Sequence, residues 1–322
     1  MKSTFLIQRY VPEVDSAPHM ERYEMDLWDE ATILDGLLAI KDQRDDSLAF
    51  RRACRHAICG SCTMVVNGYS KLVCKTAISS EVKRGRKELH ITPMRTMRVV
   101  KDLVVDMAPF WKHFRDLEPW LQPDPKKVPP PNQEYRLTPD KLVPSRKDLN
   151  CIQCAVCVSD CGVAEVDSHF AGPMALAKAH RFVTDPRDSK RKERLQALVD
   201  LGLWDCAHAY NCMECPKHVD PAIAIADLRR ISVQAGITNN IGARHSKVFT
   251  KSVGRTGRLD ESMLVLQTVG ITNIPGQIRN GPQGLRMLMK GKLPLPMVQQ
   301  ERVDHPKEVR RIYEAVASGE ER

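Results

Sequence analysis

The chain has 322 residues, which is room for two or three domains with more than one hydrophobic core. Its 49 Lys and Arg against 40 Asp and Glu give a formal charge of +9, a modest excess for a surface of this size. No basic run alternates with aromatic residues as a nucleic-acid platform would, so no nucleic-acid partner is expected. No apolar stretch approaches the roughly 18 residues that span a bilayer, which predicts no transmembrane segment.

Residues 1–108 are predicted to form a small α+β domain. Alternating apolar and polar residues predict strands at Thr4–Tyr10 and Arg22–Leu27. A helix is predicted at Thr32–Lys41, because its apolar residues fall on one helical face. The run Cys62–Tyr69 contains Asn-Gly, the strongest short signal for a β-hairpin.

A group of cysteines follows this helix with the spacing C-x4-C-x2-C-x11-C. The group is Cys54, Cys59, Cys62 and Cys74. Thiolate sulfur is the soft donor that iron–sulfur clusters require, and this spacing is the plant-type [2Fe–2S] run. The small residues Ala57, Gly60 and Ser61 let backbone N–H groups approach bridging sulfides. The order of elements and the cysteine loop are typical of a β-grasp ferredoxin.

Residues 109–144 are predicted to be a proline-rich connector. The stretch from Pro119 to Pro144 holds eight of the chain's 21 prolines. Because proline fixes φ and lacks an N–H group, this density disfavours both helix and strand and predicts a semi-rigid link.

Residues 145–240 are predicted to form an α-helical domain with two further cysteine runs. Helices are expected at Pro173–Phe182 and Lys192–Asp200, and another opens at Pro221. One cysteine run precedes these helices and one lies among them, with the spacings C-x2-C-x2-C-x3-C and C-x5-C-x2-C. The two runs comprise Cys151, Cys154, Cys157 and Cys161, and then Cys206, Cys212 and Cys215.

The two runs are predicted to exchange ligands. In two-cluster ferredoxins the fourth cysteine of such a run binds the other cluster. A [4Fe–4S] cluster is therefore assigned to Cys151, Cys154, Cys157 and Cys215, and a second cluster to Cys161, Cys206 and Cys212. Position 209, where a fourth thiolate would stand, is Ala, so the second cluster is predicted to be [3Fe–4S].

Zinc binding and disulfide bonding are the alternative uses of the cysteines. Zinc sites need four ligands each, and eleven cysteines do not divide into such sets, so a zinc-bound structural module is the weaker interpretation. Disulfides are weaker still, because the number is odd and Met1–Arg9 contains no long apolar signal region, which favours a reducing compartment.

Residues 241–322 are predicted to be a basic, cysteine-free C-terminal extension. Its hydrophobic periodicity is weak except for a last helix from Pro306 to about Val316. We expect it to lie over partner subunits and to fold mainly on assembly.

Residues 1 to about 235 resemble the iron–sulfur subunit of succinate dehydrogenase/fumarate reductase. The resemblance rests on the three cysteine runs in order and on four further stretches, Leu48–Cys62, Pro93–Met107, Phe170–Pro173 and Asp185–Asp188. It implies a flavoprotein (FAD) subunit that oxidises succinate or reduces fumarate, and single-electron transfer through the three clusters to a quinone-reactive subunit. It also implies peripheral attachment to the cytoplasmic side of the membrane through partner subunits.

The sequence departs from that family at three places. Gly162 stands where proline usually follows Cys161, and no tryptophan follows it; Ala207 separates Cys206 from His208; and the last cysteine spacing is one residue short. These departures argue against the ordinary quinone pocket. With the long tail they resemble the non-classical branch, whose anchor is a cysteine-rich peripheral subunit like those of heterodisulfide reductases, rather than a membrane bundle.

His208 is the candidate quinone-proximal residue, and its alternative role is to cap a helix or pack near the cluster. The chain has no Gly-rich dinucleotide fingerprint and no P-loop, so we expect no dicarboxylate active site on it. The second functional hypothesis is the same subunit in a thiol- or disulfide-linked fumarate reductase without quinone.

Overall fold

The computed structural model describes residues 1–82, 88–292 and 305–318. The chain divides into two compact units, Met1–Ile231 and Ser232–Arg322. The first unit contains all eleven cysteines, none of which forms a disulfide. The domain boundaries predicted at 108, 144 and 240 stay predictions.

The N-terminal part of the first unit is a five-stranded sheet with the order β2-β1-β5-β3-β4. Its strands are β1 (Lys2–Arg9), β2 (His19–Asp26), β3 (Thr63–Val66), β4 (Tyr69–Leu72) and β5 (Glu88–Thr92). Strand β1 pairs antiparallel with β2 and parallel with β5, and β5 continues antiparallel to β3. The sequence predicted the first three strands and the turn, whereas the central strand β5 was not predicted.

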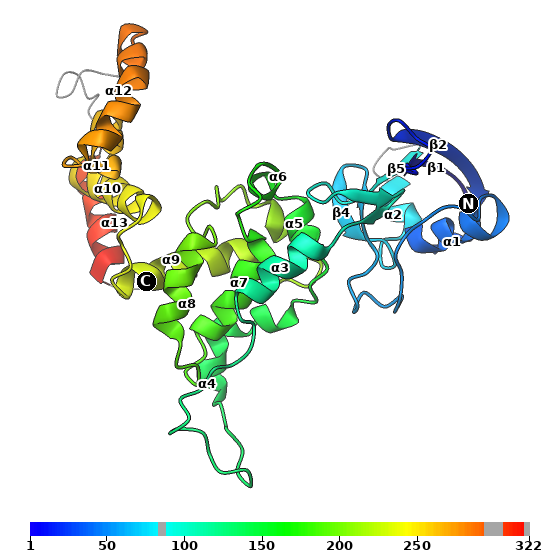
Figure 1. Ribbon diagram of the computed structural model, residues 1–322, viewed down its shortest axis with the longest axis horizontal. Coiled ribbons are helices and arrows are strands. Elements are labelled where there is room, and N and C mark those ends of the chain that lie inside the picture. The colour runs from blue at the N-terminus through cyan, green and yellow to red at the C-terminus, as the bar shows by residue number, and fades with distance from the viewer. Residues whose placement is uncertain (83–87, 293–304, 319–322) are drawn as a thin grey trace. The chain divides into compact units, whose positions relative to one another are not determined.

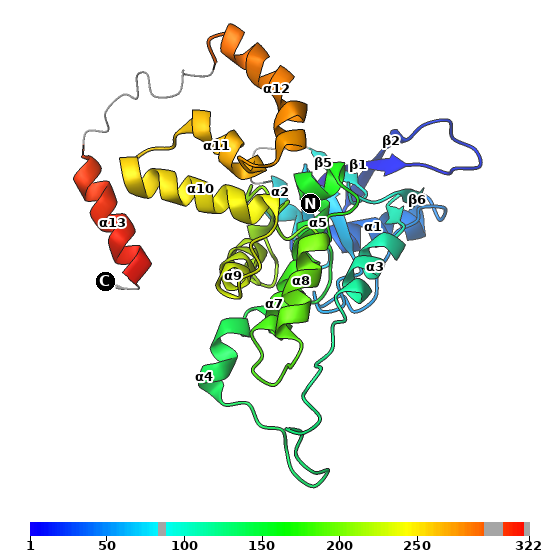
Figure 2. The ribbon, with the colours of Figure 1, turned by 60° about the vertical axis from the view of Figure 1, so that its left-hand side comes forward.

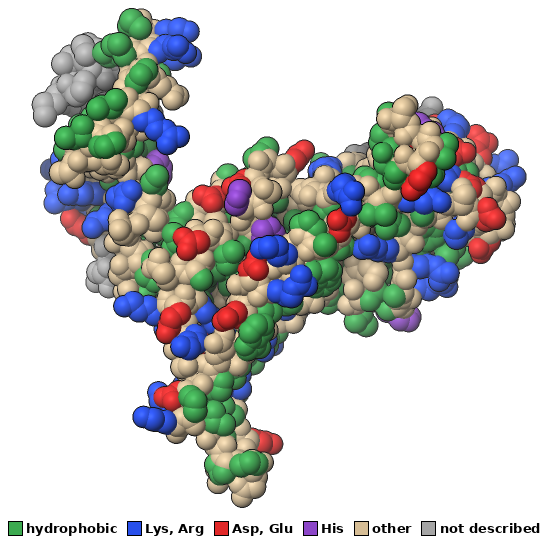
Figure 3. Space-filling view, in the orientation of Figure 1, with side chains coloured by type: hydrophobic (Ala, Val, Ile, Leu, Met, Phe, Trp, Pro, Cys, Tyr) green, Lys and Arg blue, Asp and Glu red, His purple; other side chains and the backbone are tan. Residues whose placement is uncertain are grey.

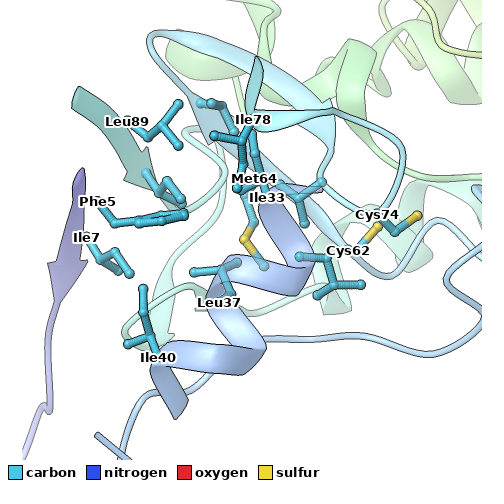
Figure 4. Packing of buried hydrophobic residues seen from close by; sticks show 14 of the residues in the cluster. Phe5, Ile7, Ile33, Leu37, Ile40, Cys62, Met64, Cys74, Ile78 and Leu89 are labelled. Carbon is cyan, nitrogen blue, oxygen red and sulfur yellow. The ribbon is translucent and has the colours of Figure 1, made fainter. Parts of the chain in front are cut away.

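Helix α1 (Ile33–Gln43) covers the sheet, as Figure 1 shows. Thr32 and Asp35 form a reciprocal capping box, in which each side chain accepts the other residue's backbone N–H. At Gly36 an added Cβ would lie 2.3 Å from Cζ of Phe5, so glycine lets this ring pack directly against the helix. Figure 4 shows the resulting core between α1 and the strands, with Ile33, Leu37 and Ile40 facing it.

A buried charge network closes the end of this domain. Asp102 lies in the turn between β6 (Val99–Lys101) and β7 (Val104–Val105) and is completely buried. Its carboxylate accepts hydrogen bonds from Arg9 Nε at 3.1 Å, from the backbone N–H of Tyr10 at 3.0 Å and from that of Ala49 at 2.8 Å. Burial alone would lower the pKa of Arg9, but hydrogen bonds to Asp102 and Asp45 outweigh it and raise that pKa.

The predicted connector contains more structure than its prolines indicated. Helix α3 (Ala108–Asp116) occupies its first residues, and one helical turn, α4 (Pro139–Leu142), lies near its end. Helix α3 lies before the dense prolines of Pro119–Pro144. The expectation that these prolines exclude helix was wrong at α4, because Pro139 stands in the first turn, where no N–H is needed. Between α3 and α4 the chain forms a long loop that projects from the helical part (Figures 1 and 2), joined to it by a bridge between Pro123 and Asp188.

The helical part of the first unit is built around α7 (Gly172–Val183), most of whose side chains are buried. It contacts α3, α5 and α8 and the short 3-10 turns before the second cysteine run. The remaining elements are η1 (Val143–Ser145), η2 (Asp148–Asn150), α5 (Val156–Ser159), α6 (Gly162–Val166), α8 (Arg191–Asp200), η3 (Asn211–Met213) and α9 (Pro221–Gln234). The predictions of α7, α8 and the start of α9 are confirmed.

The second unit is helical. Its described residues form α10 (Ile241–Thr256), α11 (Glu261–Val269), α12 (Ile274–Met289) and α13 (Pro306–Ser318). Only α13 was predicted, and α10–α12 were missed. The expectation that this stretch folds mainly on assembly stays a prediction. Each of the helices α10, α11 and α12 has an Asn or Asp side chain that caps its first turn, at Asn240, Asp260 and Asn273.

Replacing Asp102 with Ala should lower the free energy of unfolding of the N-terminal domain by about 3 kcal/mol. The change leaves the buried N–H groups of Tyr10 and Ala49 without acceptors and removes a buried partner of Arg9. The shift in urea midpoint of the full-length protein measures it. The control Glu24→Ala breaks an exposed pair with Arg22 and should cost less than about 1 kcal/mol; equal shifts would contradict the prediction.

Candidate metal centres

The first cysteine set lies at the edge of the N-terminal core. Cys62 directly precedes β3, and Cys74 follows β4, so the hairpin holds both of them at the same end. Figure 4 shows their sulfur atoms close together and pointing away from the core. Cys54 and Cys59 lie on the loop before β3; Cys59 is exposed, whereas Cys62 and Cys74 are buried. The site therefore extends from the core to the surface.

The loop directs backbone N–H groups at the cysteine sulfurs. Sγ of Cys54 accepts three of them, at 3.3, 3.4 and 3.3 Å, from His56, Ile58 and Cys59. Sγ of Cys74 accepts the N–H of Ala57 at 3.3 Å. Left-handed backbone at Arg55, Ala57 and Gly60 turns these groups inward. Of the small residues noted in the sequence, Ala57 thus donates its N–H to a cysteine sulfur.

The same geometry sets the thiol pKa values. The backbone hydrogen bond from Cys54 and the side-chain hydrogen bond from Ser61 lower the pKa of Cys59 to about 6. Burial raises the pKa of Cys62 to about 12. Because a cluster ligand is a thiolate, binding at Cys62 requires loss of a firmly held proton, which the positive charge of iron favours.

The second set converges from two distant segments. Cys151, Cys154, Cys157 and Cys215 all line one small cavity, whose other lining residues are apolar except for Lys217. Burial, followed by the negative charges of Cys215 and Cys151, raises the pKa of Cys154 to about 11. Burial also raises the pKa of Cys157 well above its ordinary value, with the other three thiolates adding to the effect. The structure therefore brings together the four thiols that the sequence assigned to one cluster.

The third set lies beside the second. Burial and the charge of Cys206 raise the pKa of Cys161. Burial, then the charges of Cys206 and Cys161, raise the pKa of Cys212 to about 11. These three thiols are thus electrostatic neighbours. The charge of Cys212 also reaches Cys157, so the two sets adjoin.

Two cations that sequence reasoning missed hold the cluster loops. Lys178 on α7 donates to the backbone oxygen of Cys151 at 3.1 Å. Arg229 on α9 donates to the backbone oxygens of Leu203 at 2.9 Å and Cys206 at 2.8 Å. Neither contact has a local signal, because each joins segments more than twenty residues apart in sequence.

A buried histidine, His180, bridges two carboxylates from segments on either side of the cysteine runs. His180 lies between Asp148, 2.6 Å from Nδ1, and Asp227, 3.0 Å from Nε2. Burial alone would lower the pKa of His180, but the hydrogen bonds and charges of both carboxylates raise it. Because Asp148 belongs to η2, His180 to α7 and Asp227 to α9, this bridge fixes the two cysteine runs against each other.

His208 lies in the loop between Cys206 and Cys212. Its backbone is left-handed, and its N–H is directed at Sγ of Cys206 at 3.5 Å. Burial, followed by the charge of Arg229, lowers the pKa of its half-buried side chain. The ring of Tyr210 lies 6.0 Å from the imidazole. The backbone N–H of His208 thus points at a thiol of the third set. The suggested contact of His208 with quinone stays a proposal.

The first and second sets are linked by direct contacts. Thr63, the residue after Cys62, donates its hydroxyl to the backbone oxygen of Cys154 at 2.7 Å. An added Cβ at Gly60 would lie 2.8 Å from Cα of Cys154. Beside them, the hydroxyl of Ser70 is 2.7 Å from both Ser159 and Asp160 on the α5 side. The hairpin that carries two thiols of the first set therefore packs against the segment that carries the second.

The donor sets fit iron–sulfur clusters. Each comprises three or four thiols. Each iron of a [4Fe–4S] or [3Fe–4S] cluster takes one protein thiolate, and each iron of a [2Fe–2S] cluster takes two. Within residues 1–82, 88–292 and 305–318, no three or more Cys, His, Asp or Glu side chains are placed to hold a single metal ion. A ferredoxin sheet joined to a helical part with two adjoining thiol sets defines a class of protein, the multi-cluster electron carriers.

Comparisons with known proteins agree with this class. A family model described as a 2Fe-2S iron-sulfur cluster binding domain matches residues 4–112, and one described as a 4Fe-4S dicluster domain matches residues 148–219. The fumarate reductase iron-sulfur subunit of Mycobacterium tuberculosis is 39% identical over 221 residues, which are 68% of this chain and 88% of that protein. The mitochondrial succinate dehydrogenase [ubiquinone] iron-sulfur subunit 1 of Oryza sativa is 38% identical over 239 residues, 72% and 83% of the two chains.

Two further proteins are similar to this chain. The 8-methylmenaquinol:fumarate reductase iron-sulfur subunit of Wolinella succinogenes is 34% identical over 252 residues, 76% of this chain and 77% of that protein. A chain of the Mycobacterium smegmatis Sdh1 complex in the apo form superposes with a TM-score of 0.64 and 26% identity, covering 72% of this chain and 96% of that one. The protein belongs to the family of iron–sulfur subunits of succinate dehydrogenases and fumarate reductases, the electron-transfer subunits of these oxidoreductase complexes. The family carries a [2Fe–2S], a [4Fe–4S] and a [3Fe–4S] cluster, as predicted.

Replacing Gly60 with Ala should disturb both the first and the second cluster. The new Cβ would lie 2.8 and 2.9 Å from Cα and Cβ of Cys154, and the positive φ adds strain of about 1–2 kcal/mol. Iron content and the electron paramagnetic resonance signals of both clusters measure the effect. Gly68→Ala is the matched control, with φ of +87° but no atom within 4 Å, and it should keep both signals. Equal loss in the two variants would show that strain, not the contact with Cys154, is responsible.

Proposed function

We propose that this chain passes single electrons between a flavoprotein (FAD) subunit, which oxidises succinate or reduces fumarate, and a quinone-reactive subunit. The observation that carries the proposal is the convergence of thiols from two separate runs into the adjoining second and third sets, beside the first set on the ferredoxin sheet. The printed names of the relatives support the reaction, since they include a ubiquinone-linked succinate dehydrogenase and a menaquinol-linked fumarate reductase.

The proposed ligand sets are those predicted from the spacing. The [2Fe–2S] cluster would be held by Cys54, Cys59, Cys62 and Cys74, the [4Fe–4S] cluster by Cys151, Cys154, Cys157 and Cys215, and the [3Fe–4S] cluster by Cys161, Cys206 and Cys212. Bound there, the clusters supply one-electron redox chemistry. The shared cavity supports the second set, and the mutual charge effects among the thiols support the third.

The protein's own contribution is spacing and electrostatic tuning. The Thr63 hydroxyl connects the residue after Cys62 to the backbone of Cys154, which gives a short hydrogen-bonded route between the first two sets. The N–H groups directed at Cys54 stabilise negative charge there, and Lys178 places a positive charge near Cys151. Both effects stabilise the reduced form of a neighbouring centre and so raise its potential.

The surface around the third set supports a docking site for the quinone-reactive subunit. Cys161 and Cys206 are only half-buried, and Tyr210 between the last two ligands is 56% exposed. Val166, which ends the helix after Cys161, is 85% exposed. Apolar side chains this exposed beside a redox centre favour coverage by a partner. We further propose that this partner is the cysteine-rich peripheral type, on the grounds of Gly162, Ala207 and the short last spacing.

Dicarboxylate chemistry is proposed to lie on the flavoprotein subunit, because this sequence has neither a Gly-rich dinucleotide fingerprint nor a P-loop. No helix in the described parts of the chain is both long and apolar enough to cross a bilayer. We propose peripheral attachment on the cytoplasmic side of the membrane through the partner subunits.

The isolated chain should contain about nine irons, two, four and three in the proposed ligand sets, and show the low-field signal of an oxidised [3Fe–4S] centre. Ala209→Cys should shift that centre towards [4Fe–4S] by supplying a fourth thiolate. Iron and acid-labile sulfide analysis with electron paramagnetic resonance tests both points. Two [4Fe–4S] clusters in the wild-type chain would refute the role given to Ala209.

Replacing Cys215 with Ser should remove most of the [4Fe–4S] signal and leave the [3Fe–4S] signal, although Cys212 is only three residues away. The reason is that Cys215 lines the cavity of the second set. Cys161→Ser is the reciprocal variant, since it adjoins the second run and should affect the [3Fe–4S] signal first. The opposite pattern in the two variants would show that the short spacing has exchanged the ligands.

A further inference from the structure

Helix α12 (Ile274–Met289) has its apolar side chains on the outside. Five large apolar residues recur at intervals of three, four or seven, so they share one face of the helix. All five are exposed, by 66, 70, 58, 41 and 74%, at Ile274, Ile278, Leu285, Leu288 and Met289. In a helix that packs only against its own protein, such a face is turned inward.

The opposite face of α12 is the one that packs within the unit. The half-buried positions are occupied by small or amide residues, namely Gly276, Gln277, Asn280 and Gly284. The amide of Gln277 donates to the backbone oxygens of Leu266 and Gly270, both at 2.9 Å, and so joins α12 to α11 and the turn after it. The outward position of the apolar face is therefore fixed by specific contacts on the other side.

The charges around this face have one sign. Residues 262–300 contain four basic residues and no Asp or Glu. Arg279, Arg286 and Lys290 are exposed and, at intervals of seven and four, lie along one flank of the apolar face. Figure 3 shows apolar and basic side chains adjacent on the part of the surface that α12 forms in Figure 1.

We propose that α12 binds in the plane of an anionic phospholipid surface, so that the chain contacts the membrane directly. An exposed apolar face flanked by Arg and Lys is the pattern of helices that lie in the headgroup region, with long basic side chains reaching the phosphates. At 16 residues the helix is about 24 Å long, which is too short and too polar to span a bilayer. A second copy of the chain is a poorer occupant, because it would bring another wholly basic segment to the same place.

The proposal goes beyond the electron-transfer function and does not depend on it. The full-length chain with its clusters is mixed with vesicles of phosphatidylcholine alone or of phosphatidylcholine with phosphatidylglycerol, and bound protein is measured by sedimentation. We expect binding only to the phosphatidylglycerol vesicles, weakening with added salt. Hydrogen exchange should slow over residues 274–289 when these vesicles are present.

Two pairs of substitutions test which part of the chain binds. Ile278→Asp with Leu285→Asp should weaken binding more than tenfold. The matched pair Ile312→Asp with Val316→Asp adds the same charge to exposed apolar positions, 66 and 76% exposed, on α13 of the same unit, and should weaken it far less. Arg286→Gln and Lys290→Gln should each weaken it about fivefold. Far-ultraviolet circular dichroism equal to wild type verifies that the helices of the second unit are kept in the variants, and equal cluster signals verify the first unit.

Three results would overturn the proposal. Absence of binding to phosphatidylglycerol vesicles would leave a protein subunit as the occupant of the α12 face. Equal loss in the two Asp pairs would show that the net positive charge of the chain, not this face, causes binding. Slowed exchange elsewhere with none at 274–289 would place the lipid contact on another element.

Discussion

The structure depends on bringing together thiols from two segments that α7 and α8 separate in the chain. Cys215 must reach the cavity of Cys151, Cys154 and Cys157, while Cys161 must reach Cys206 and Cys212. The helices within the two cysteine segments are too short to hold the thiols in place by themselves. The almost wholly buried α7 provides the support, because its core packing and the bridge through His180 fix both segments at once.

The thiol sets of the ferredoxin part and of the helical part must also be held together. The β3–β4 hairpin gives the first thiol set a rigid base, and Thr63 and Ser70 on it hydrogen-bond to the α5 segment. Gly60 allows a backbone approach that any side chain would prevent. An electron carrier needs its centres at fixed separations, and here they are fixed by these polar contacts and by a buried apolar cluster that joins Met94 and Val105 to Ala155 and Met174.

The second unit differs from the first in where the apolar residues of one helix, α12, lie. Its helices are capped and packed, yet α12 turns apolar residues outward and small or amide residues inward. The sequence did not predict α12 because it contains Gly276, Gly281, Pro282 and Gly284, residues that disfavour a helix interior. The apolar residues that recur at helical spacing are what make the face of α12 fit a lipid surface.

The sequence by itself determined the chemistry and most local structure. Cysteine spacing indicated three clusters and their family, while Thr32, Asn67-Gly68 and Pro173 marked a helix start, a turn and another helix start, because caps and turns depend on a few adjacent residues. Only the tertiary structure decided the parallel pairing of β5 with β1, the burial of Asp102 beside Arg9, and the contacts of Lys178 and Arg229 with the cluster loops. These features join residues far apart in the chain, and no local pattern records which distant group a strand or a charge will meet.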